Sequence, residues 1–174
     1  MQNERVPLPR PAAPTDVPTL REIEISAGDA FRDIDMAAIA HDDPPTPESY
    51  LEAVELRHLW VIDDDDATPV AYLWAFELDG GLHIEQVSVA ATHARRGLGR
   101  ALIEHAAGLA RERGAPCLTL TTFAQVPWNA PYYERIGFRT LDENELSPGL
   151  RAIRDAEAAH GLGEWPRVCM RLDL

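Results

Sequence analysis

The sequence predicts an α/β protein built on a mixed, mostly antiparallel β-sheet. Along its 174 residues the hydrophobic pattern alternates between short apolar runs, typical of strands, and apolar positions three and four residues apart, typical of helices. A strand–helix–strand succession between His83 and Thr122 requires a parallel pair, because a helical crossover joins its strands. The turn Asp79-Gly80-Gly81 instead joins two antiparallel strands.

Seven segments have the pattern of strands. The first contains Pro7 and Pro9, which lack the N–H group of a sheet ladder and therefore confine it to an edge. The run 59–62 ends at four consecutive aspartates, Asp63 to Asp66, which we interpret as a solvated turn rather than a cation site. The expected strands are 6–10, 59–62, 69–78, 83–89, 117–122, 138–141 and 168–172.

Five segments have the apolar spacing of helices. Asp16 is placed to cap the first of them, and Thr46 or Pro47 opens the second. Gly114 ends the third, whose apolar residues form one stripe. The expected helices are 17–30, 47–56, 98–113, 128–135 and 150–159.

The length of 174 residues suits one hydrophobic core, so we expect a single domain over 1–174, with a partly flexible start at about 1–14. That start is polar and proline-rich, unlike a secretory signal, and no apolar run approaches the roughly 20 residues that cross a bilayer. Cys117 and Cys169 lack metal-ligand spacing and are expected as buried thiols. We therefore expect a cytoplasmic protein with no membrane partner and no metal.

The charge balance excludes one class of partner. With 29 Asp and Glu against 16 basic residues, the net charge is −13, which is the opposite of the basic surface that a nucleic acid requires. An acidic surface attracts cationic small molecules, although acidity also serves solubility alone. The charge therefore excludes nucleic-acid binding and leaves the partner open.

The motif that carries chemistry is a strand end, a glycine loop and a helix start. The strand ends at Val87-Ser88-Val89, and the loop reads Ala-Arg-Arg-Gly-Leu-Gly-Arg-Ala over 94–101. Glycines let backbone amides turn towards one point, and the amides and dipole of a helix start attract anions. Arginines around the loop add countercharge. The motif predicts a cradle for a pyrophosphate.

Other phosphate-binding loops fit this motif less well. A dinucleotide-binding fingerprint needs a third glycine where Leu102 stands. A Walker A loop needs Lys and then Ser or Thr after its second glycine, where Arg100-Ala101 stand. A helix start with small residues and no ligand is a further alternative.

A second block, Val-Pro-Trp-Asn-Ala-Pro-Tyr-Tyr-Glu-Arg-Ile-Gly-Phe over 126–138, follows about thirty residues later. In this order the two blocks resemble the CoA-binding loop and the Asn…Tyr-x-x-x-Gly-Phe signature of the GCN5-related N-acetyltransferase (GNAT) family. The likeness extends loosely from Arg5 to Leu141 and is thin after Asn144. Ala94 departs from the family pattern, which usually has Arg or Gln there.

The resemblance implies a GNAT-type fold, with about six or seven strands flanked by helices on both faces, and acetyl-CoA as cosubstrate. Backbone groups of Val87 and Val89 would pair with the pantetheine arm, and the Val89 amide would stabilise the oxyanion. Asn129 would bind the arm, and Tyr133 would protonate the departing thiolate. The implied cofactor-binding residues are Val87, Ser88, Val89, Arg95, Arg96, Gly97, Leu98, Gly99, Arg100, Ala101, Asn129 and Tyr133.

A base must deprotonate the amine, and a regular strand would bring residues 83, 85, 87 and 89 to one face. Glu85 is the first candidate, and His83 is the second because an unperturbed imidazole pKa of roughly 6.5 suits the task. Purely structural alternatives stay open: Glu85 at a strand edge, His83 in a solvated turn, and Tyr133 as a core aromatic residue.

The resemblance implies an N-acetyltransferase that moves an acetyl group to a primary amine by direct attack in a ternary complex. The acidity favours a small cationic acceptor. A protein N-terminus or lysine is the alternative acceptor, and a non-catalytic acyl-CoA sensor is the alternative function. We expect the early helices and the tail after Asn144 to select the acceptor, and the tail to support a homodimer.

Overall fold

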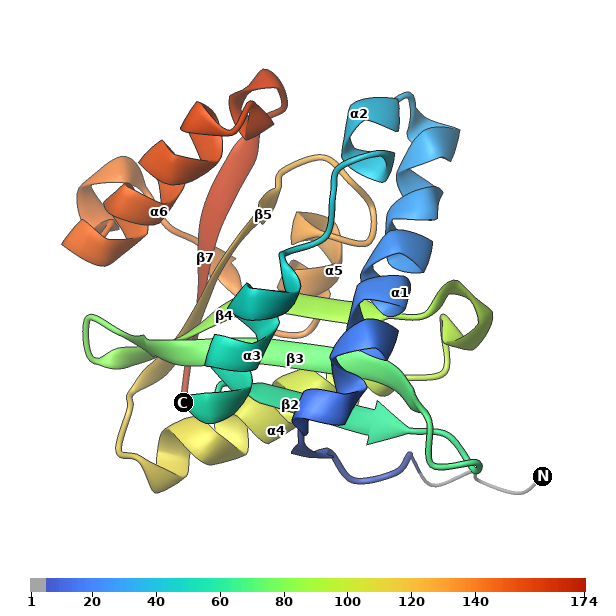
Figure 1. Cartoon of the computed structure of the whole chain (residues 1–174). Coiled ribbons are helices and arrows are strands. Elements are labelled where there is room, and N and C mark those ends of the chain that lie inside the picture. Colours follow the sequence, from blue (N-terminus) through green and yellow to red (C-terminus); the bar gives the residue numbers. More distant parts are fainter. Residues whose placement is uncertain (1–5) are drawn as a thin grey trace. The chain divides into compact units, whose positions relative to one another are not determined.

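Figure 1 shows the computed structural model, which describes residues 6–174. These residues divide into two compact units. The first unit comprises residues 6–74 and 86–105, and the second comprises 75–85 and 106–174. The chain passes repeatedly between the two units. The expectation of a single domain stays a prediction, and the part of the expected flexible start at 1–5 lies outside the described residues.

The strands form one mixed sheet in the order β1-β2-β3-β4-β5-β7-β6. β4 and β5 pair in parallel, whereas β1–β2, β2–β3, β5–β7 and β6–β7 pair antiparallel, which confirms the predicted sheet with its local parallel pair. The strands are β1 (Arg10–Pro11), β2 (Leu59–Asp63), β3 (Pro69–Leu78), β4 (Gly81–Val89), β5 (Cys117–Phe123), β6 (Arg139–Thr140) and β7 (Arg167–Asp173).

Five of the described helices agree with the prediction in position and differ at their ends, whereas the short helix at Ala37–Ala40 was not predicted. The helices are α1 (Val17–Gly28), α2 (Ala37–Ala40), α3 (Pro47–Glu55), α4 (Leu98–Glu112), α5 (Ala130–Arg135) and α6 (Pro148–Ala159). Short 3-10 turns at Pro14–Asp16, Asp29–Ile34, Ala91–His93, Glu143–Glu145 and Leu162–Glu164 were not predicted. Within the described residues no helix is long and apolar enough to cross a membrane.

In the first unit, α1 and α3 cover one face of β2 and β3 (Figure 1). Leu20 of α1 and Tyr50 of α3 are fully buried there against Val61 of β2. Trp60, which alternates to the other face of β2, packs against His105 of α4 with ring centroids 5.7 Å apart. Each fully buried aliphatic side chain contributes roughly 1.5–3 kcal/mol, so this packing holds α1 firmly to the strands.

The edge strand and the start of α1 differ from the prediction because of one arginine. β1 is only Arg10–Pro11, where 6–10 was expected, and Arg10 lies 2.8 Å from Asp16 and 2.6 Å from Asp63. Asp16 therefore makes no side-chain cap on α1. Burial acts to raise the pKa of Asp16, but the hydrogen bonds from Arg10 and Ala13 outweigh it and lower that pKa.

In the second unit, β5 lies between β4 and β7. Its ladder with β4 contains Leu82, His83 and Ile84, and its antiparallel ladder with β7 runs along the whole of β5. α6 packs through Leu150 onto Cys169 of β7. Cys117 and Cys169 are both buried free thiols, as predicted.

Candidate active site

The glycine loop has the backbone geometry of an anion cradle. The φ angles of Arg95 and Gly97 are positive, at 63° and 82°. Such alternation turns successive N–H groups towards one point. The first bond of the helix runs from the Ala101 N–H to the Gly97 carbonyl oxygen at 3.0 Å, so helix geometry leaves the first-turn amides without intrahelical acceptors. The loop thus presents amides and the positive end of the α4 dipole to an anion.

The same loop lies close to the end of β4. A methyl group placed on Gly99 would lie 3.8 Å from Cγ1 of Val87 and 3.9 Å from Cγ2 of Val89. Val87 and Val89 therefore share a strand face towards α4, and a side chain larger than a methyl group at position 99 would crowd them. Gly97, with its positive φ, and Gly99, close to both valines, fit a phosphate group at this helix start.

The arginines of the loop lie at its rim. Arg95, Arg96 and Arg100 are exposed. Arg100 pairs with Glu104 at 2.9 Å, with both side chains about two-thirds exposed, at 67% and 66%. An ion pair this open to water is weak, so Arg100 can exchange Glu104 for a phosphate oxygen.

The opposite side of the same strand end carries a polar cluster that the sequence analysis missed. The carboxylate of Glu24, on α1, accepts hydrogen bonds from Tyr72 OH at 2.6 Å, Ser88 Oγ at 2.5 Å and Gln86 Nε2 at 3.0 Å. Ser88 was expected among the cofactor-binding residues, and its side chain is engaged by Glu24. A signal was available: Glu24 follows Leu20 by four residues and so interrupts the apolar stripe of α1.

Two buried tyrosines extend this cluster. The hydroxyls of Tyr50 and Tyr72 lie 3.0 Å apart, and both side chains are fully buried. Burial raises the pKa of Tyr50 to about 12, and burial together with Glu24 raises the pKa of Tyr72 well above its usual value. Both phenols stay neutral near pH 7, and Tyr72 acts as a fixed hydrogen-bond donor to Glu24.

In the second unit, His83 is a buried strand residue. Its side chain is 1% exposed, and Nδ1 lies 3.0 Å from Thr119 Oγ1. Burial lowers the pKa of His83 to about 4, and nearby Glu157 opposes this only in part. The prediction of an ordinary imidazole pKa is therefore wrong. The alternative of a solvated turn is also wrong, because His83 lies within β4, beside Thr119 of β5, and its ring is buried.

His83 should make the fold sensitive to acid. The unfolded chain binds the proton first, at an ordinary pKa of about 6.5, so the stabilising contribution is complete above pH 6.5 and is lost as the pH falls towards 4. Between pH 7 and pH 4.5 we expect the free energy of unfolding in urea to fall by about 2 kcal/mol more in the wild type than in His83→Gln. Equal losses in the two proteins would contradict a neutral, buried His83.

Glu85 lies beside His83 and is open to solvent. Its side chain is 47% exposed, and Oε2 lies 3.8 Å from His83 Nε2, so these two residues do share a strand face. Desolvation raises the pKa of Glu85, and the negative charge of Glu157 raises it further, against an opposing effect of Arg167. A carboxylate with a raised pKa is a better proton acceptor than an ordinary one.

The second block forms α5 and its approach. Asn129 stands at the N-cap position, where its side chain does not cap the helix. The ring of Tyr133 packs edge-on against Phe138 and Tyr132, at centroid distances of 5.6 and 5.5 Å. Burial raises the pKa of Tyr133, with a smaller contribution from Tyr132. Tyr133 therefore keeps its proton, whether it serves as an anchor, a donor or both.

The tail contributes an ion pair that the sequence analysis also missed. Arg167 of β7 binds Glu157 of α6 through Nε at 3.0 Å and Nη2 at 2.8 Å, and the Thr121 hydroxyl donates to the same carboxylate. The guanidinium lies 4.5 Å from the centre of the Phe123 ring. A cavity of about 210 Å³ adjoins this pair and includes Trp165 in its wall.

Each unit brings together part of the predicted site. The first contains the strand end at 87–89 and the loop at 95–101, with Val87 and Val89 beside Gly99. The second contains His83 beside Glu85, and also Asn129 and Tyr133. Across residues 6–174 no group of three or more His, Cys, Asp or Glu side chains is arranged to hold a metal ion.

Several solved structures similar to this chain are described as acetyltransferases. The chain matches an acetyltransferase of the GNAT family from Staphylococcus aureus Mu50 with a TM-score of 0.73, at 13% identity over 95% of this chain and 98% of that one. It matches the PaiA N-acetyltransferase from Thermoplasma acidophilum, in complex with coenzyme A, with a TM-score of 0.66, at 11% identity over 95% and 98%. The ribosomal-protein-S18-alanine N-acetyltransferase from Escherichia coli matches with a TM-score of 0.65, at 20% identity over 95% and 92%.

These structural similarities show the fold, and a match in sequence shows the family. The model of the Acetyltransferase (GNAT) family matches residues 27–138, which include β4, the glycine loop and the second block. The match covers well over half of the chain and both motifs on which the resemblance rested. The chain therefore belongs to the acetyltransferase (GNAT) family.

Proposed function

We propose that this protein is an acetyl-CoA-dependent N-acetyltransferase that acetylates the primary amine of a small cationic acceptor. The observation that carries the proposal is the cradle at the start of α4, with positive φ at Gly97 and the close approach of Gly99 to Val87 and Val89. The family supplies the class of reaction, and a structural neighbour is described in complex with coenzyme A.

The loop residues would hold and orient the cosubstrate, which supplies an acetyl thioester. Amides of the loop would bind the pyrophosphate, and Arg95, Arg96 and Arg100 would neutralise its charge. The backbone of Val87 and Val89 would pair with the pantetheine arm as a strand does, and Asn129 would donate to the same arm. The Val89 N–H would donate to the carbonyl oxygen of the thioester.

Proton transfers would fall to residues of the second unit. As the N–C bond forms and the C–S bond breaks, the amine loses a proton and the sulfur gains one. Glu85, exposed and with a raised pKa, is the proposed acceptor of the first, directly or through water. Tyr133, which keeps its proton, is the proposed donor of the second. The low pKa of His83 makes it the weaker base.

Release of CoA thiol from acetyl-CoA in the presence of amines tests the function. All 16 basic residues of the chain are arginines, so the protein offers no lysine as a background acceptor. We expect release with small cationic amines, and in Glu85→Gln a lower kcat/KM without the rise with pH that titration of Glu85 would produce. Release only with peptides would indicate a protein acetyltransferase. Binding of acetyl-CoA without release would indicate a sensor.

A further inference from the structure

The Glu24 carboxylate is unusual in its surroundings. It is half-buried on α1, and its three hydrogen-bond donors, Tyr72, Ser88 and Gln86, are all neutral. Tyr72 and Ser88 are 0% and 3% exposed, so their hydroxyl groups are held in place by the core. The carboxylate is therefore fixed in one orientation before any ligand arrives, which lowers the entropy lost on binding.

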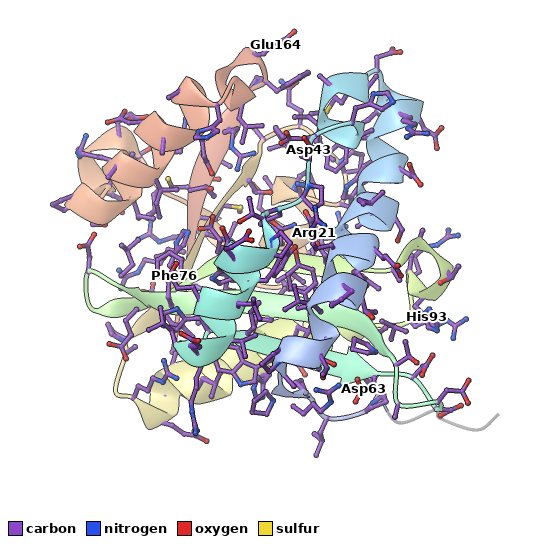
Figure 2. The ribbon with its side chains drawn as sticks, in the orientation of Figure 1. Arg21, Asp43, Asp63, Phe76, His93 and Glu164 are labelled. Atoms are coloured by element: carbon purple, nitrogen blue, oxygen red, sulfur yellow. The ribbon has the colours of Figure 1, made fainter. Side chains whose placement is uncertain are left out.

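The side chains of residues 6–174 form no ion pair with this carboxylate. Arg21, labelled in Figure 2, lies one turn earlier on α1. It donates through Nε to the Pro45 carbonyl oxygen at 3.3 Å, and its charge opposes the rise in the pKa of Tyr50. A carboxylate offers about four acceptor positions, and three are used, two of them on Oε2 and one on Oε1. Among the described residues only Gln86 donates to Oε1, so one of its acceptor positions is unused.

The position of Glu24 ties it to the proposed chemistry. Two of its donors, Gln86 and Ser88, flank Val87 on β4. Val87 and Val89 direct their side chains towards Gly99 of α4, whereas Gln86 and Ser88 reach α1. Within the first unit the carboxylate thus lies across the strand from the phosphate cradle. A molecule held against Glu24 would lie beside the backbone that is proposed to carry the thioester.

We propose that Glu24 is the anchor for an ammonium group of the acceptor, and that the acceptor is a diamine or polyamine. One ammonium would remain protonated on Glu24 while a second, deprotonated amine attacks. A half-buried carboxylate with no ion-pair partner in residues 6–174 gains from a bound cation, because both are then shielded from water together. This assignment deepens the proposed function and rests on it. It makes Glu24 a specificity-determining residue and leaves the proton transfers to other groups.

Binding of 1,4-diaminobutane to the full chain saturated with CoA tests the anchor by calorimetry, without requiring turnover. We expect Glu24→Gln to weaken diamine binding roughly 10- to 100-fold, which is the effect of losing one charge-assisted hydrogen bond. Glu22→Gln removes the same charge from an exposed position on α1 and should change the affinity less than twofold. Acetyl-CoA affinity should be the same in the two variants. The melting temperature should be lower in Glu24→Gln than in Glu22→Gln, because a glutamine amide cannot accept all three hydrogen bonds.

Butylamine, with one ammonium, separates the anchor from a merely structural role. A structural defect in Glu24→Gln would weaken diamine and acetyl-CoA binding alike and would overturn the proposal, as would equal diamine binding in Glu24→Gln and the wild type. A wild type that binds diamine no better than butylamine would overturn it too. Should Glu24→Gln fail to fold, Glu24→Asp decides, because its retracted charge should weaken diamine binding about 3- to 10-fold. Absence of thiol release with every amine would refute the enzymatic function while this binding result stands.

Discussion

Replacing Gly97 with glutamate should raise the dissociation constant of acetyl-CoA at least 100-fold in a calorimetric titration. Two effects act together. A side chain at φ +82° costs roughly 1–2 kcal/mol, so the loop will tend to leave the cradle geometry. The added carboxylate also places negative charge at the helix start that is proposed to receive the pyrophosphate.

Two variants separate these effects from general damage. Gly97→Ala introduces the strain without the charge, and we expect a loss of about 10-fold or less. Gly114→Glu introduces the strain and the charge at the other end of α4, where φ is +72° and a Cβ would meet nothing within 4 Å. It should bind acetyl-CoA as the wild type does. Micromolar binding retained in Gly97→Glu would mean that the cofactor lies elsewhere.

Replacing Tyr133 with phenylalanine should lower kcat by about 10²- to 10⁴-fold, the usual contribution of a positioned proton donor. The ring contacts with Phe138 and Tyr132 survive the change, so only the hydroxyl is lost. Because the pKa of Tyr133 is raised, the native hydroxyl keeps its proton up to alkaline pH. The KM for acetyl-CoA should therefore move only a few-fold while kcat collapses.

Tyr132→Phe is the matched control, because it removes a neighbouring hydroxyl from the same helix and should leave kcat within about twofold. Unchanged turnover in Tyr133→Phe would assign this residue to the packing of α5 alone. Equal losses in both variants would indicate damage to the helix. Single-turnover measurements of thiol release would show whether the chemical step itself has slowed.

Features that depend on neighbouring residues could be predicted from the sequence. Asp79 and Gly80 in the hairpin turn both have positive φ. Short hairpin turns favour Asp and Gly because these residues tolerate positive φ. Gly114 has positive φ just after α4, as its place in the pattern predicts. The order of the strands' patterns also indicated the parallel pair, because a helical crossover leaves few alternatives.

Predictions that concerned distant partners were the ones that changed. Asp16 was expected to cap α1 and is taken by Arg10, which also binds Asp63, 53 residues away from it. His83 was expected to have an ordinary pKa, and its burial against Thr119 lowers that pKa to about 4. In both cases the outcome depends on how deeply a polar group is buried and on which groups contact it there. The hydrophobic periodicity of the sequence indicates neither of these.

Most helices and strands, the glycine loop and the family could be predicted from the sequence, because helix periodicity, turn chemistry and the two motifs are properties of residues close together in the chain. The surroundings of the polar groups depend on the tertiary structure. Glu24 meets Tyr72, Gln86 and Ser88 across 48, 62 and 64 residues of chain. Such contacts form when α1 packs on the sheet, because hydrophobic burial brings the helix there and the polar groups must then satisfy one another.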